Sequence, residues 1–322
     1  MLVSFVLVSE GSLSTIENSL NSILAQTIDD YEIVIVGDNN ISDNSEDKEL
    51  KKKFWELKNC KLVLNSSIQG YSVSWNIAMD LVEGEYLKFI AANDSIEPNF
   101  VVVLKENLQK NSKDQIDLIE HLVELDGIGK GISTQNFLEN QRIYNLENNY
   151  EPFAFLNPIL FNKIFRTKLI HEFGFKFRRF VRFDMLFVYK FLGQTKKFLA
   201  LNNLKMGTRF LEQSKHSAFD IVNQWTHITN YYRRIGKYKL LKDYITYAYY
   251  KTLCYVWLEL IRLYDNKLLM KKAVSFAERK FSEKREDFIK NNEVFKLKRD
   301  EVFNNICEDF NKYLKDLLKT SK

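Results

Sequence analysis

The sequence predicts an α/β protein, with a doubly wound, mostly parallel and twisted sheet followed by a helical region. Short apolar and β-branched runs alternate with segments of helical periodicity over the first part of the chain, which is typical of strand–helix–strand units. No proline follows Pro158 and no glycine follows Gly236, so the last third is expected to be helical. A chain of 322 residues has room for both parts. We predict an α/β domain over residues 1–218 and an α-helical region over residues 219–322.

The composition excludes a disordered chain, because 45% of the residues are apolar and 14% are aromatic. Cys60, Cys254 and Cys307 lie far apart, a spacing that favours a reducing compartment over a disulfide framework or a zinc site. The apolar start, residues 1–8, is too short for a signal or an anchor. No run approaches the roughly 20 apolar residues that span a bilayer. We therefore expect a cytoplasmic protein.

The predicted elements follow one another in the order expected of parallel strands joined by helices. Buried strands are expected at residues 3–8, 31–36, 61–64 and 86–90. Helices are expected at about residues 12–26, 45–57, 72–82 and 98–111, with Pro98 in the first turn of the last one. Ser12 or Ser14 can cap the first helix, and a turn is favoured where Asp38 ends the second strand.

The strand predicted at residues 86–90 is the one beside which we expect a site. Its run Tyr-Leu-Lys-Phe-Ile is followed closely by the polar turn Asn93-Asp94-Ser95. In open α/β sheets, ligands bind outside the carboxyl ends of the strands. The turn should therefore bring polar oxygens to the ligand-binding edge of the sheet.

Several motifs resemble family 2 glycosyltransferases in their order and spacing, over about two thirds of the chain. They are Val3-Ser4, residues 19–27 and 31–36, Asp38, Asp43-Asn44-Ser45, Gly70, Asn76, Ala78 and Gly84-Glu85-Tyr86. The resemblance implies a GT-A fold, which is Rossmann-like. It also implies an inverting transfer of a sugar from a nucleotide-diphosphate donor, most often a UDP-sugar. The acceptor would be a hydroxyl of a surface glycan, a lipid-linked sugar or a glycosylated protein.

The resemblance assigns donor-binding roles to residues near the ends of the predicted strands. Asp38 would hold the base, because a carboxylate can accept the imide N–H of uracil. Asn93 and Asp94 would lie at the ribose–phosphate region. Arg209 could pair with the diphosphate and partly replace a missing cation, with a solvated loop as the alternative. The other donor-binding positions are Glu10, Gly70 and Asn76. Ordinary turns at Asp38 and at residues 93–95 are the alternative.

A divalent cation, Mn²⁺ or Mg²⁺, is implied at Asn93 and Asp94. The family's pattern places aspartates at positions 91 and 93, where this chain has Ala91 and Asn93. Asp94 remains next door, so the site has lost a carboxylate that such a cation prefers. Trp75 stands where the family typically has arginine, and we expect its ring in the core rather than stacked on a sugar.

The catalytic base implied by the resemblance is Asp184, at the start of a helix. It would remove the proton from the acceptor hydroxyl as that oxygen attacks the anomeric carbon. Phe183 replaces the family's glutamate, while the upstream runs 162–166 and 173–177 fit the pattern that precedes the base. A plain helix cap is the alternative for Asp184.

The last third of the chain carries both a basic set of residues and an apolar stripe. From Asp220 onward there are 22 Lys and Arg against 14 Asp and Glu, in a chain of net charge +5. An apolar stripe suited to packing comprises Leu241, Ile245, Ala248, Tyr249, Leu253, Val256, Leu260 and Leu263. A basic set could meet a lipid-linked acceptor at the inner face of a membrane, namely Lys267, Lys271, Lys272, Arg279, Lys280, Lys284 and Arg285. Solvated helices are the alternative.

No motif supports nucleic-acid binding. The sequence leaves the oligomeric state open, and a homo-oligomer is one possibility.

A second hypothesis about function belongs to another class of protein. The chain could be a degenerate relative that has lost catalysis and binds a partner or a glycan. Gly37, Trp75, Ala91, Asn93 and Phe183 favour it, because each replaces a polar or charged residue of the family. Asp38, Asp94 and Asp184 favour the enzyme.

Overall fold

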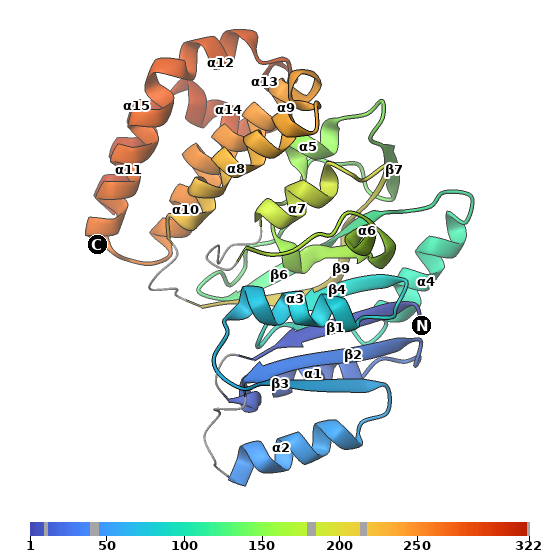
Figure 1. Ribbon diagram of the computed structural model, residues 1–322. Helices are drawn as coiled ribbons and strands as arrows, with labels where there is room; N and C mark the ends of the chain where they lie inside the picture. The colour runs from blue at the N-terminus through green and yellow to red at the C-terminus, as the bar shows by residue number, and fades with distance from the viewer. Residues whose placement is uncertain (10–11, 39–44, 179–184, 213–217, 321–322) are drawn as a thin grey trace. The chain divides into compact units, whose positions relative to one another are not determined.

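Two compact units make up the chain. The computed structural model describes residues 1–9, 12–38, 45–178, 185–212 and 218–320. The first unit, Met1–Asn148 with Asn157–Leu211, carries the sheet (Figure 1). The second unit, Asn149–Leu156 with Glu212–Lys322, is helical in its described residues.

The sheet is mixed. Its strands are parallel in the part where nucleotide binding is expected. Its first four neighbours run in the order β3-β2-β1-β4 and are parallel throughout, and they are β1 (Val3–Val8), β2 (Tyr31–Asp38), β3 (Cys60–Asn65) and β4 (Tyr86–Ile90). The order continues through β8 (Lys163–Arg166), β6 (Leu118–Gly127), β9 (Lys197–Leu211) and β5 (Ser95–Ile96), with β7 (Arg142–Asn145) on β9. The predicted α/β class and the four predicted strands are confirmed.

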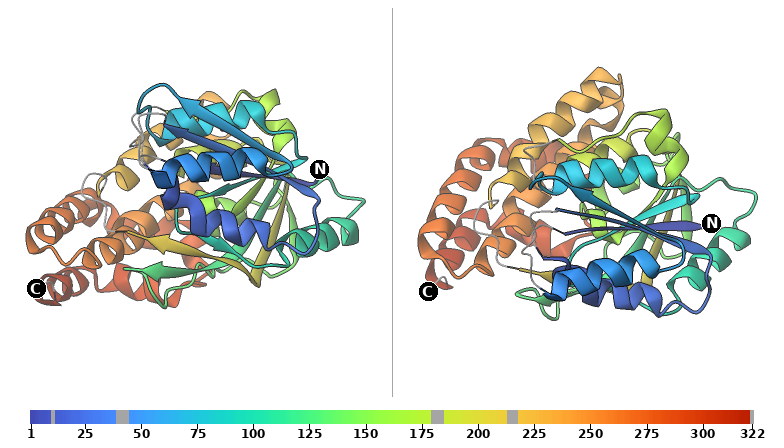
Figure 2. Two further views of the ribbon diagram at one scale, coloured as in Figure 1. Left: turned by 90° about the horizontal axis from the view of Figure 1, so that it is seen from below. Right: turned by 60° about the horizontal axis from the view of Figure 1, so that its bottom comes forward.

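Helices cover both faces of this sheet. Those of the first unit are η1 (Leu13–Ile16), α1 (Glu17–Leu24), α2 (Ser45–Glu56), α3 (Tyr71–Leu81), α4 (Phe100–Lys110), η2 (Leu160–Asn162), α6 (Thr167–Glu172) and α7 (Met185–Leu192). Alternate residues of β1 (Val3, Phe5 and Leu7) share one buried cluster with side chains of α1, α2 and α4. Figure 2 shows α3 on the opposite side of the strands from α1 and α2. Pro98 lies before α4, which begins at Phe100 after Asn99, and so is not in its first turn.

An aromatic cluster fills the other face of the sheet. Trp75 of α3 is 7% exposed and contacts the rings of Phe89, Phe161 and Phe177, with centroids 4.9 to 5.8 Å apart. Phe177 in turn stacks on Phe187 of α7 at 4.3 Å. The expectation that Trp75 belongs to the core is confirmed.

The second unit is built from short helices around an aromatic core. They are α5 (Glu151–Phe155), α8 (Asp220–Arg234), α9 (Tyr238–Lys251), η3 (Thr252–Val256), α10 (Trp257–Arg262), α11 (Lys267–Phe281), η4 (Ser282–Lys284), α12 (Arg285–Asn291), α13 (Glu293–Lys296), α14 (Glu301–Glu308) and α15 (Phe310–Thr320). None of the helices in the described residues has the length and apolar character needed to cross a membrane.

The predicted apolar stripe of this unit is wrong at Val256, which is 41% exposed. Leu241, Ile245, Ala248 and Leu253 are buried as expected. Thr252–Val256 then forms a π-helical turn, which holds more residues per turn than an α-helix and rotates the following side chains. The buried face is therefore continued by Trp257 and Ile261.

Candidate functional site

The carboxyl ends of the parallel strands meet at one edge of the sheet. In the strand register Val8 lies opposite Val36, Leu7 opposite Ile90 and Asp38 opposite Asn65. Asp38 therefore ends β2 at the same edge as the turn that follows β4. This is the edge at which an open α/β sheet binds ligands. Glu10, which follows β1, lies outside the described residues, and so does Asp184.

Asp38 is 1% exposed, and one of its carboxylate oxygens has no partner among the residues that the structure describes. Asn65 Nδ2 donates to Asp38 Oδ1 at 3.1 Å and also lies 3.1 Å from Ser74 Oγ of α3. Asp38 Oδ2 is buried and accepts no hydrogen bond from any residue that the structure describes. A buried acceptor without a donor is costly. The arrangement thus leaves a fixed carboxylate oxygen ready to accept an N–H or O–H from a ligand.

Gly70 and Asn76 lie on either side of Ser74, whose Oγ contacts Asn65 at this edge. Gly70 caps the helix with φ 82°, in the left-handed region that favours glycine, and its carbonyl accepts from the N–H groups of Val73 and Ser74. Asn76 has both ends of its amide bonded to the backbone of Phe177. Its Nδ2 donates to Phe177 O at 3.0 Å, and Phe177 N donates to its Oδ1 at 2.8 Å. Asn76 therefore fixes the chain just before residues 179–184.

The turn after β4 places Asp94 inside the protein. Asn93 has φ 64°, a left-handed conformation that asparagine tolerates. Asp94 Oδ2 accepts from Ala91 N at 3.2 Å, and Oδ1 accepts from Phe210 N at 2.9 Å. Its side chain is 7% exposed, and burial raises the pKa of this carboxyl group while Arg209 opposes that rise.

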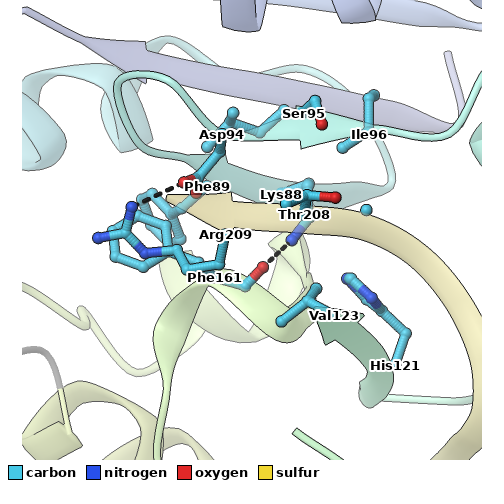
Figure 3. Close-up of a pocket in the computed structure, with 12 residues that line it drawn as sticks. Lys88, Phe89, Asp94, Ser95, Ile96, His121, Val123, Phe161, Thr208 and Arg209 are labelled. Carbon is cyan, nitrogen blue, oxygen red and sulfur yellow. Dashed lines mark hydrogen bonds and ion pairs between the residues drawn. The ribbon is translucent and has the colours of Figure 1, made fainter. Parts of the chain in front are cut away.

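Arg209 completes this corner of the site. Its Nη1 donates to Asp94 Oδ1 at 2.7 Å and to Phe210 O at 2.7 Å. Its guanidinium carbon lies 4.5 Å from the ring centroid of Phe161, a cation–π contact. Figure 3 shows the Arg209 guanidinium joined to the carboxylate of Asp94 by a dashed line. The sequence placed Asp94 and Arg209 in one site, and the structure brings them into direct contact.

The pairing of β5 with β9 depends on Gly207. Ile96 lies opposite Gly207, and Ser95 lies opposite Thr208. A Cβ atom at position 207 would stand 2.4 Å from Ser95 O, so only glycine lets the two strands approach this closely. Arg209 follows two residues later and is thereby brought beside Asp94.

A buried lysine lies under the same corner. Lys88 of β4 is 2% exposed, and its Nζ donates to Phe161 O (Figure 3). Lys88, Asp94, His121 and Arg209 line one small pocket. Burial lowers the pKa of Lys88 to about 7, although Asp94 favours its charged form. Burial likewise lowers the pKa of His121 well below its usual range, so its ring is neutral.

Sequence reasoning gave no role to Lys88 or Phe161. One signal was present for Lys88, namely a single lysine inside the apolar run 86–90. The segment that carries Phe161 is held by a second buried lysine. Lys163 Nζ lies 2.5 Å from Glu120 Oε2 and 2.5 Å from Asn157 O, and both Lys163 and Glu120 are almost completely buried.

The fold is that of a GT-A-type α/β protein. Asp38, Asp94 and Arg209 lie at the carboxyl edge of its sheet. The model of the family described as Glycosyl transferase family 2 matches residues 4–174, more than half of the chain. The chain therefore belongs to this family of enzymes, and the resemblance noted in the sequence is confirmed.

The comparisons with individual proteins agree. EpsH of Bacillus subtilis (strain 168), whose name places it among the glycosyltransferases, is 25% identical over 183 residues, or 55% of this chain. That match covers 51% of EpsH, so the chain spans about half the length of this relative. TarS 1-349 of S. aureus in complex with UDP-GlcNAc has a TM-score of 0.63 at 18% identity, over 85% of this chain and 81% of that one.

A mannosyltransferase from Pyrobaculum calidifontis, PcManGT in complex with GDP-Man and Mn²⁺, has a TM-score of 0.54 at 14% identity. That match covers 86% of this chain and 75% of PcManGT. At these identities the structural likenesses show the fold, and the predicted GT-A fold is confirmed.

Proposed function

We propose that this protein is an inverting glycosyltransferase that moves a sugar from a nucleotide-diphosphate donor, a UDP-sugar, to a hydroxyl of a surface glycan, a lipid-linked sugar or a protein-linked sugar. Donor binding is inferred from Asp38 Oδ2, which accepts no hydrogen bond within the described part of the chain. A buried carboxylate oxygen at the carboxyl end of β2, to which no described residue donates, suits the imide N–H of uracil. TarS, which shares the fold, has been crystallised with UDP-GlcNAc.

Other residues have roles suited to their positions. Gly70, Asn93, Asp94 and Arg209 lie near the ends of the strands, where the diphosphate and sugar of the donor would lie. Glu10 and Asp184 lie outside the described residues, and their roles rest on the family pattern. Asn76 acts in this proposal through Phe177, whose backbone it holds. It sets the start of the segment that leads to Asp184.

The reaction is a single displacement. The acceptor oxygen attacks the anomeric carbon of the donor sugar while Asp184 takes the proton from that hydroxyl. The bond between the anomeric carbon and the diphosphate oxygen breaks, and its electron pair leaves with UDP. Because the base and the leaving diphosphate lie on opposite faces of the sugar, the anomeric configuration inverts.

The test is a panel of nucleotide sugars assayed for turnover with the intact chain. We expect the wild type to release UDP from one of the donors. Asp184→Asn should release none, while its affinity for UDP stays the same. The degenerate-relative hypothesis gives a different outcome, because such a protein would release no UDP from any donor, with or without an added glycan. UDP affinity measured by calorimetry then separates a dead enzyme that still binds nucleotide from a protein that binds none.

A peripheral contact with an anionic membrane surface is a further part of this proposal. Lys267, Lys271 and Lys272 of α11 are exposed and form no ion pair with a residue that the structure describes. Leu268 is exposed among them. A basic face that includes an apolar side chain suits a bilayer interface. A lipid-linked acceptor would be presented at such a surface.

A further inference from the structure

The end of β4 does not provide the ligands that a divalent cation needs. Mg²⁺ and Mn²⁺ are held by hard oxygen ligands, usually one or two carboxylates together with waters and phosphates. Ala91 has no side-chain oxygen, and Asn93 offers only a neutral amide oxygen. No group of three His, Cys, Asp or Glu side chains that could hold a metal occurs in the part of the chain that the structure describes.

The remaining carboxylate, Asp94, is already used inside the protein. It accepts hydrogen bonds from Ala91 N, Phe210 N and Arg209 Nη1, and these occupy three of its roughly four acceptor positions. Its side chain is also nearly inaccessible. A cation at Asp94 would have to displace the Arg209 guanidinium, which is itself a positive charge at 2.7 Å. The residues present do not fit the metal that the family pattern implies.

Arg209 is placed to supply that charge. Asp94 and Phe210 O fix its Nη1, and the Phe161 ring supports its plane. Its Nε and Nη2 make no hydrogen bond to any described residue, and the side chain is 19% exposed. Figure 3 shows the second terminal nitrogen pointing away from Asp94. A guanidinium with one edge fixed and the other free can receive a phosphate through two N–H groups.

We propose that Arg209, held by Asp94 and Phe161, takes the place of the divalent cation at the donor's diphosphate, so that this protein binds its nucleotide without metal. In this proposal Asp94 is the positioning residue for Arg209 rather than a metal ligand. The inference rests on the proposed function, because it assumes a nucleotide-diphosphate donor.

Charge supports the same assignment. The ion pair of Asp94 and Arg209 is neutral by itself and would attract a diphosphate weakly. Lys88 lines the same pocket and is cationic below about pH 7, since burial lowers its pKa to about 7. Protonated Lys88 therefore gives this corner a net positive charge within the protein, where the low dielectric strengthens its attraction for an anion.

The test compares UDP with uridine, which carries the same base and no phosphate. Calorimetric titrations of the whole chain are run with EDTA and, separately, with Mn²⁺. We expect UDP to bind more tightly than uridine in EDTA, and Mn²⁺ to change the UDP affinity less than threefold. Arg209→Met should weaken UDP about 10- to 100-fold, the range for a charged hydrogen bond, and leave uridine unchanged.

Arg142→Met is the matched control. Arg142 also pairs with a carboxylate, Glu139 at 2.9 Å, and also lies over an aromatic ring, Tyr144 at 4.8 Å. It should leave both affinities unchanged. Melting temperatures of both variants show whether they fold. If Arg209→Met does not fold, Arg209→Gln serves in its place.

The outcomes separate a failure of the metal-free inference from a failure of the proposed function. UDP binding that appears only with Mn²⁺, or that survives the loss of Arg209 in EDTA, overturns the inference and leaves the proposed function standing. Failure of both UDP and uridine to bind under either condition overturns the proposed function, and the inference with it.

Discussion

The carboxylate of Asp94 and the guanidinium of Arg209 lie 2.7 Å apart, although 115 positions separate the two residues in the chain. β5 and β9 bring them together, since the antiparallel pair Ser95–Thr208 lies one residue after Asp94 and one residue before Arg209. The contact joins the end of the parallel sheet to its antiparallel edge. Positions 91 and 93 lack the family's aspartates, and the remaining Asp94 holds Arg209 in place.

Gly207→Ala tests how this pairing depends on a residue without a side chain. The added Cβ would lie 2.4 Å from Ser95 O, a backbone atom that cannot move away alone. We expect the free energy of unfolding to fall by about 1–3 kcal/mol, as for overpacking, and the UDP affinity to fall with it. Chemical denaturation and calorimetry measure the two quantities.

Gly129→Ala is the control for that substitution, because its added Cβ would meet the end of the flexible Leu211 side chain at 2.8 Å. It should cost less stability than Gly207→Ala. Equal stabilities for Gly207→Ala and the wild type would show that the close approach of β5 and β9 is not required.

Lys88 should make stability depend on pH above neutrality. Its pKa is about 7 in the folded protein and near 10.5 when unfolded. Between these values the unfolded chain binds more protons, so the free energy of unfolding should rise with pH, by up to about 1.4 kcal/mol per unit. Below pH 7 both states are protonated, and Lys88 adds no slope.

Lys88→Met should remove the part of this slope that lies between pH 7 and 10. Urea titrations at several pH values measure it. Lys105→Met, which removes an exposed lysine paired with Asp30, should leave the slope in place. A wild-type curve that is flat over this range would contradict the assignment to Lys88.

Asn76→Ala should affect turnover more than nucleotide binding. The substitution removes both hydrogen bonds to the backbone of Phe177, at a cost of about 1–3 kcal/mol in stability. Because Phe177 leads to the segment that contains Asp184, we expect kcat to fall at least tenfold with little change in UDP affinity. Steady-state kinetics and calorimetry separate the two effects.

Asn107→Ala provides the comparison for Asn76→Ala. Asn107 is also largely buried, but among the described residues its side-chain amide donates to Val103 O of its own helix alone. It should leave kcat unchanged. A fall in UDP affinity as large as the fall in kcat for Asn76→Ala would assign Asn76 to the donor site directly.

Membrane contact through α11 can be measured with vesicles. Replacing Lys267, Lys271 and Lys272 by glutamine should weaken binding to phosphatidylserine-containing vesicles about 100-fold, at about 1 kcal/mol per lysine. Neutral phosphatidylcholine vesicles should bind neither protein. Sedimentation of protein with vesicles gives the affinity.

The control removes the same charge from elsewhere in the helical unit, by replacing Lys290, Lys296 and Lys298 with glutamine. It should bind the anionic vesicles as the wild type does. Equal losses for the two triple variants would indicate a response to overall charge, without a defined face.

Much of the fold could be predicted, because short stretches of sequence indicate its strands and helices. The short apolar runs at residues 3–8 and 86–90, rich in β-branched and aromatic residues, are strands as predicted, and the parallel order places Asp38 at the ligand-binding edge. The contact between Asp94 and Arg209 could not be derived from such patterns, since it depends on a two-residue strand and a distant glycine. Val256 was misplaced because a π-helical turn leaves no clear mark in the periodicity.

Titration of UDP into the wild-type chain and into Asp38→Asn shows whether the carboxyl end of β2 binds the base of a nucleotide sugar. The substitution replaces a buried acceptor oxygen that has no described partner and should change stability little. We expect the wild type to bind UDP and uridine, and Asp38→Asn to weaken both affinities at least tenfold. Equal affinities in the two proteins, or no binding to a folded wild type, would contradict this role of Asp38.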